Sequence, residues 1–200
     1  MARAGKGFTL IELLIVIALL GALATILMSQ LSADREMVLD DGIVSTEMMN
    51  IRNAFSRFVA DCAPDRNDYL AISDVADPGA DASFARAREG FCVLWDAAWI
   101  AEAGKFSFPS SWQEDRERGW RGPYLIGMGG IEHDRRRLRD PLFSGERDGL
   151  NGHCYLLVND GGSLYLLYTG RNGENDSYPK YAGDPGKDDK ILLLAPGVLD

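Results

Sequence analysis

The sequence lacks the groups that most enzymes use. Among its 200 residues it has only two histidines, His133 and His153. It also has no G-x-S-x-G nucleophile elbow, no H-E-x-x-H metal-binding pair and no Walker-type phosphate loop. A histidine beside a cysteine, as in His153 and Cys154, is more often structural than half of a catalytic pair. We therefore expect no enzymatic activity.

Cysteine is scarce as well. The three thiols are Cys62, Cys92 and Cys154, and none of them belongs to a C-x-x-C pair. This excludes a zinc ribbon or a thioredoxin-like redox motif. At most one internal disulfide can form among the three, and the sequence does not choose the pair. The same residues could instead be small buried apolar groups.

The chain also lacks an excess of positive charge. Its 21 lysines and arginines face 30 acidic residues, which gives a net charge of −9. A broad basic surface for phosphates is therefore excluded, and we expect no nucleic-acid partner. The arginines within residues 135–139 are flanked by acids and are typical of a solvated loop.

What the sequence does have is an apolar run over residues 8–28, in which Glu12 is the only charge. Twenty-one residues at ~1.5 Å each match a hydrocarbon core about 30 Å thick, so we expect a transmembrane helix. Arg3 and Lys6 precede the run without an acid between them. This pattern predicts a cytoplasmic N-terminus, with the rest of the chain on the far side.

Two features at the start of this run need an explanation. The basic stretch ends at Gly7, directly before the apolar residues, whereas a secretory signal peptide is cleaved after its apolar core. Any cleavage here should therefore precede the apolar run. A carboxylate such as Glu12 costs about 2.5–3.5 kcal/mol inside a membrane, so we expect it to have a positively charged partner.

The hexapeptide GFTLIE at residues 7–12, followed by the apolar run, resembles the prepilin peptidase site of type IV pilins and type II secretion pseudopilins. The resemblance implies that a prepilin peptidase cuts between Gly7 and Phe8, and that Phe8 is then N-methylated. It also implies that Glu12 pairs with a neighbouring subunit's terminal amine, an attraction that a low-dielectric stack of helices strengthens. The alternative is an uncleaved single-pass anchor.

Periodicity predicts the remaining fold. Apolar residues from Val44 to Cys62 recur at steps of four and three, which indicates an amphipathic helix that ends near Asp61 or Cys62, before Pro64. Residues 154–158 and 164–168 read as strands joined by a glycine-rich hairpin connection, and Ile191–Leu194 as a further strand. Residues 91–103, closed by Gly104, predict one short helix.

Together these elements predict an α+β pilin fold, in which a long N-terminal helix packs on a small antiparallel sheet. The transmembrane segment forms the first half of that helix. The expected organisation is a leader at 1–7, the transmembrane and polymerisation segment at 8–28, its amphipathic continuation at 29–62 and a globular α+β domain at 63–200.

Three further segments are similar to the major pseudopilin of the type II secretion system: WRGPYL at 120–125, Asp140-Pro141 and GRNGE at 170–174. The last resembles that family's calcium-binding loop. Acidic side chains gathered on such a loop are oxygen ligands of the type that calcium takes. The candidate ligands are Glu174, Asp176, Asp184, Asp188 and Asp189. An acidic, solvated loop is the alternative.

The resemblance implies a structural subunit that polymerises into a filament, foremost the type II secretion pseudopilus that drives protein export. Its implied partners are the prepilin peptidase, further copies of itself, other pseudopilins and the inner-membrane secretion platform. It would lie in the bacterial inner membrane as a single-pass protein, with its C-terminal domain in the periplasm. A type IV pilus major or minor pilin is one alternative, and a membrane-anchored periplasmic enzyme is an alternative of another class.

Overall fold

The structure is a computed structural model of residues 1–200. It describes residues 10–75, 86–103, 106–126, 131–132, 137–139, 142, 154–170 and 188–196, with the backbone alone at 25–39, 103, 132 and 137. Two compact units make up the chain, Met1–Ile43 and Val44–Asp200.

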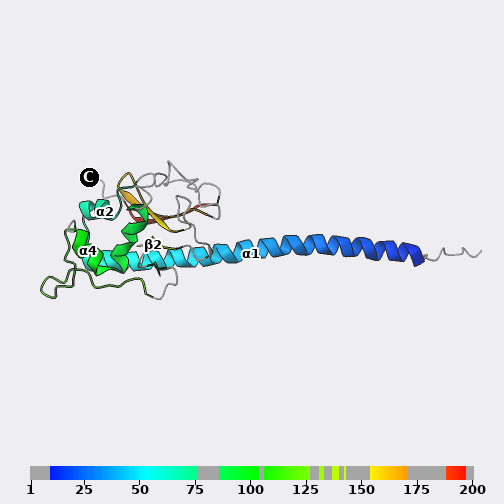
Figure 1. The fold of residues 1–200 in the computed structure, drawn as a ribbon, viewed down its shortest axis with the longest axis horizontal. Helices are drawn as coiled ribbons and strands as arrows, with labels where there is room; N and C mark the ends of the chain where they lie inside the picture. The colour runs from blue at the N-terminus through cyan, green and yellow to red at the C-terminus, as the bar shows by residue number, and fades with distance from the viewer. Residues whose placement is uncertain are drawn as a thin grey trace, which may run out of the picture. The chain divides into compact units, whose positions relative to one another are not determined.

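Helix α1 (Leu10–Cys62) is one uninterrupted helix of 53 residues that contributes to both units (Figure 1). In the second unit it buries the stripe that the sequence predicts. All its members are buried: Val44, Met48, Ile51, Phe55, Phe58 and Cys62. Their spacing of three and four residues places them on one face of the helix.

The end of α1 at Cys62 confirms the predicted boundary. Ala63 adopts a left-handed conformation, with φ of 44°, and its N–H donates to Val59 O at 2.9 Å. Arg118 donates from Nε to Cys62 O at 2.8 Å and from Nη2 to Ala63 O at 2.9 Å. These bonds satisfy carbonyls that a helix end leaves without an intrahelical partner.

A short helix that the sequence analysis did not predict, α2 (Arg66–Ile72), follows directly. Asp65 is its N-cap, and Asp65 and Asp68 form a reciprocal capping box. Asp68 is fully buried and also accepts hydrogen bonds from Ser107 N and Oγ, both at 2.6 Å. This carboxylate therefore joins the start of α2 to a segment 39 residues later in the chain.

The prediction of one helix over residues 91–103 is wrong. The segment forms a 3₁₀ helix, η1 (Gly90–Leu94), and a separate α-helix, α4 (Ala97–Ala103). Asp96 causes the break, because its Oδ1 accepts hydrogen bonds from Ala98 N at 2.9 Å and Trp99 N at 3.2 Å. A side chain that caps the first turn of a helix marks its start and not its interior.

The predicted antiparallel sheet is present. β3 (Leu156–Asp160), β4 (Ser163–Tyr168) and β5 (Lys190–Ala195) pair in that order, and every pair is antiparallel. The hairpin between β3 and β4 is tighter than predicted, because only Gly161 and Gly162 separate the strands. Both have positive φ, 59° and 85°, as a two-residue hairpin turn of this kind requires. A separate short hairpin pairs β1 (Ile131–Glu132) with β2 (Arg137–Leu138).

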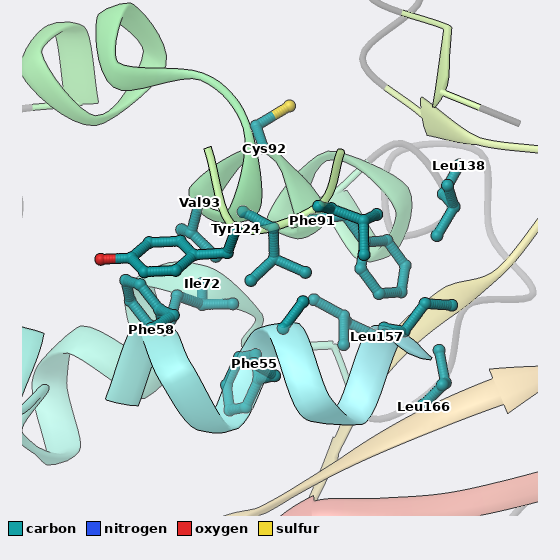
Figure 2. Close-up of a cluster of buried hydrophobic side chains, with 14 of the residues drawn as sticks. Phe55, Phe58, Ile72, Phe91, Cys92, Val93, Tyr124, Leu138, Leu157 and Leu166 are labelled. Carbon is teal, nitrogen blue, oxygen red and sulfur yellow. The ribbon is translucent and has the colours of Figure 1, made fainter. Parts of the chain in front are cut away.

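Both faces of this sheet are apolar. Leu157 and Leu166 lie in the larger core cluster with Phe55 and Phe58 of α1, as Figure 2 shows. Alternate strand residues, Leu156, Val158 and Leu167, form a second cluster with Val75, Ala87 and Cys154. Successive side chains of a strand point to opposite faces, so one hairpin supplies both clusters.

The three cysteines do not form the disulfide that the sequence analysis allowed. Cys62, Cys92 and Cys154 are all buried, and none of them is disulfide-bonded. Cys62 and Cys92 belong to the larger core cluster, and Cys154 belongs to the second one. They therefore serve as small buried groups, which is the alternative to a disulfide that the sequence left open.

Candidate functional site

The first unit presents an apolar surface around its helix. Leu10, Ile11, Leu13 and Leu14 expose between 56% and 84% of their surface. Successive helical side chains point about 100° apart, so exposure at neighbouring positions covers all sides of the helix. Exposed apolar area of this extent marks a surface that binds lipid, another helix or another protein.

Glu12 lies within this surface, in the first turn of α1, and is itself exposed. A negative side chain there is favoured by the positive end of the helix dipole. Large apolar side chains follow it as far as Leu23, and Val16 is the least exposed of them, at 46%. Glu12 thus provides one charge within an otherwise apolar helical surface.

The predicted cleavage and methylation residues, Gly7 and Phe8, lie outside the described residues. Of the predicted span 8–28, residues 8 and 9 and the side chains of 25–28 also lie outside them. Within the part of the chain that the structure describes, no helix is both long enough and apolar enough to cross a membrane.

Some of the candidate calcium ligands also lie outside the described residues. Glu174, Asp176 and Asp184 lie outside the described residues, whereas Asp188 is exposed and Asp189 is buried. Among the described residues, no group of three or more histidines, cysteines or acids could hold a metal ion. The Asp188 carboxylate lies against Gly170, which has a positive φ of 61° and no room for a Cβ. Residues 170 and 188, which flank residues 171–187, are therefore in contact.

The WRGPYL segment has a clear structural role. Trp120 Nε1 donates to Val93 O at 2.8 Å, and Tyr124 N donates to Leu94 O at 2.7 Å. The Tyr124 ring packs edge-on against Phe58, with 5.9 Å between ring centroids. The segment therefore joins η1 to α1, and Figure 2 shows the Tyr124 side chain beside Phe58 of α1 and Val93 of η1.

Tyr124 also contacts the last residue of α1. Its hydroxyl lies 3.9 Å from Cys62 Sγ and accepts a hydrogen bond from Arg121 N at 2.9 Å. Burial raises the pKa of the Cys62 thiol from 9.0 to about 12, and burial likewise raises the pKa of Tyr124. A thiol that stays protonated is a poor nucleophile, so this pair is structural.

Sequence reasoning missed a groove in the second unit. It has a volume of about 450 Å³ and lies between one face of α1 and the end of the WRGPYL segment. Its lining residues are Asn50, Asn53, Arg57, Tyr124, Leu125 and Ile126. The polar spacing of 50, 53 and 57 was visible in the sequence, but the position of residues 124–126 beside it was not.

Comparison with known families identifies one match. The prokaryotic N-terminal methylation motif matches residues 3–28. No curated protein and no solved structure matches the chain. The motif supports a type IV pilin-like, structural protein, and it is consistent with processing by a prepilin peptidase and assembly with pilin-like subunits.

Proposed function

We propose that this chain is the structural subunit of a pilin-like filament, foremost the type II secretion pseudopilus that drives protein export. The observation that carries the proposal is the methylation motif at residues 3–28, joined to a helix whose apolar side chains are exposed on every side. A helix of this kind gains stability when lipid or other helices cover it. Lipid would cover it before assembly, and neighbouring subunits would cover it afterwards.

In this mechanism the peptidase removes the leader between Gly7 and Phe8 and frees an amine that is then methylated. The subunit waits in the inner membrane with its globular domain in the periplasm. Glu12 of one copy pairs with the Phe8 amine of the next, which gives each copy a defined neighbour. A pair of opposite charges in such a low-dielectric stack attracts far more strongly than in water. The inner-membrane platform drives assembly.

A pseudopilus is proposed ahead of a pilus because of the segment at 120–125. It resembles major pseudopilins in sequence, and here it joins α1 to η1 through Tyr124 and Trp120. A type IV pilus major or minor pilin shares the same N-terminal motif. Deletion of the gene separates the two, because loss of an exported protein supports the pseudopilus and loss of surface filaments supports the pilus.

We further propose that the acidic segment binds calcium through Glu174, Asp176, Asp184, Asp188 and Asp189. Asp188 lies against Gly170, which precedes Glu174 by four residues, and this contact would let Glu174 and Asp188 share one ion. Calcium should then raise Tm, and Asp188→Asn should remove most of that rise. An equal rise in the variant would contradict this ligand set.

The proposed processing is tested by intact mass and N-terminal sequencing of the membrane-extracted protein, with and without a co-expressed prepilin peptidase. The expected mature chain begins at methylated Phe8. A chain that keeps residues 1–7 despite an active peptidase would instead be a simple anchored protein, and the proposal would fail.

A further inference from the structure

The groove beside α1 carries a positive charge, in a protein whose net charge is −9. Arg57 is exposed on its wall, and Nη2 donates to Tyr124 O at 2.6 Å. Among the residues that the structure describes, Arg57 forms no ion pair. Asp61 follows Arg57 by four residues on α1 but forms no ion pair with it, so the guanidinium keeps donors for an acid from another molecule.

The other lining groups suit a polypeptide. Asn50 and Asn53 lie on the same exposed face of α1 as Arg57 and can both donate and accept hydrogen bonds. Ile126, 77% exposed, also lines the groove and provides an apolar contact. The groove thus combines one cation, two amides and an apolar edge, which fits a short acidic segment of protein.

The same chain presents such a segment. Residues 114–117 form an exposed turn closed by Gln113 and Arg118, which pair at 3.0 and 3.4 Å. The turn holds three acids, Glu114, Asp115 and Glu117, against one base, Arg116. It is fixed to the end of α1 through Arg118 and through Gly119 N, which donates to Asp61 O at 3.0 Å.

We propose that the acidic turn 114–117 of one copy docks into the Arg57 groove of a second copy. The inference rests on the proposed function and adds to it a contact between globular domains. The turn is attached at residues 61–63 of α1, whereas the groove lies beside residues 50–57. Parallel copies must therefore be offset by four or more residues, roughly 6 Å or more along this part of the helix.

The identity of the two docking surfaces determines the type of assembly. The two surfaces are different patches of one chain, so the contact is heterologous, and each bound copy leaves its own groove or turn available to a further copy. Such contacts extend in one direction unless a rotation closes them into a ring. The contact would give successive subunits a fixed register outside the apolar helix.

A disulfide cross-link tests the contact in assembled filaments of the full chain. One copy carries Asn53→Cys and a co-expressed copy carries Asp115→Cys, while the native cysteines are buried. Arg52→Cys is the control, because Arg52 is exposed on α1 but does not line the groove. We expect roughly tenfold more heterodimer with Asn53→Cys than with the control, since docking raises the effective concentration of the pair.

Charge reversal provides a second test. Arg57→Glu should lower the yield of filaments roughly tenfold, because it places like charges together. Arg52→Glu should have little effect, and Glu114→Lys with Asp115→Lys should restore assembly of the Arg57→Glu chain. Filaments of the Asn53→Cys and Asp115→Cys chains that assemble in normal yield but form no more cross-link than the Arg52→Cys control would overturn this inference alone. Failure of the processed wild-type chain to assemble would count against the proposed function.

Discussion

Cys62 and Tyr124 are the residues at which the end of α1 meets the rest of the second unit. Both are buried, and their sulfur and oxygen atoms lie 3.9 Å apart. The sequence could show that Cys62 continues the apolar stripe of α1, because this depends only on helical spacing. It could not show the contact with Tyr124, since 62 residues separate the two along the chain. At the residue scale, the sequence predicted the roles that depend on local spacing, but it did not predict contacts with residues far along the chain.

The raised pKa of Cys62 predicts an alkaline loss of stability. The thiol has a pKa of about 12 in the folded protein against 9.0 when solvated, so between these values the folded state binds more protons. The free energy of unfolding should be fully retained below pH 9 and should fall as the pH rises towards 12. Thermal unfolding of wild type and Cys62→Ala over this range measures the effect.

The variant should be less stable at pH 7, because it leaves a cavity, but its stability should fall less steeply above pH 9. Burial also raises the pKa of Tyr124, so in both proteins Tyr124 contributes to the fall in the free energy of unfolding with pH. Equal slopes for the two proteins would contradict the assignment to Cys62.

At the scale of elements, periodic patterns predicted what local spacing determines. The stripe from Val44 to Cys62, the glycine-rich hairpin and a strand at 191–194, which the structure extends to 190–195, were all visible in the sequence. The break at Asp96 was not predicted, because its capping bonds compete with an apolar pattern that continues across them. The short helix α2 was missed because it depends on a capping box and on the distant Ser107.

The role of Asp68 in α2 gives a prediction at this scale. Its buried carboxylate accepts hydrogen bonds from Asp65 N and from Ser107 N and Oγ. Asp68→Ala should lower the free energy of unfolding by about 2–4 kcal/mol, because it removes charge-assisted bonds and leaves buried donors unpaired. Denaturant unfolding at pH 7 measures the change.

Asp115→Ala is the matched control. Asp115 is exposed and its pair with Arg116 is long, at 3.9 Å, so its loss should change stability by less than about 0.5 kcal/mol. If the two variants were equally stable, the Asp68 network would not hold α2 in place.

At the scale of the whole molecule, the chain has two kinds of surface to which we propose that other copies bind. Residues 10–24 of the first unit form an apolar helical surface with one carboxylate, Glu12, and the second unit has a groove and a turn of opposite charge. The sequence indicated the first surface, because the methylation motif and the apolar run are contiguous. It did not indicate the groove, which forms only where two distant segments meet.

The central claim, that processed subunits polymerise through Glu12, is tested most directly by filament formation. Wild type, Glu12→Gln and Glu102→Gln chains are each co-expressed with an active prepilin peptidase, and sheared or membrane-extracted filaments are quantified by sedimentation and electron microscopy. Glu102 is an exposed acid of α4 and serves as the control. Wild type and Glu102→Gln should form filaments, and Glu12→Gln should form far fewer while retaining a cleaved, folded chain. Filaments of undiminished yield from Glu12→Gln would contradict the account.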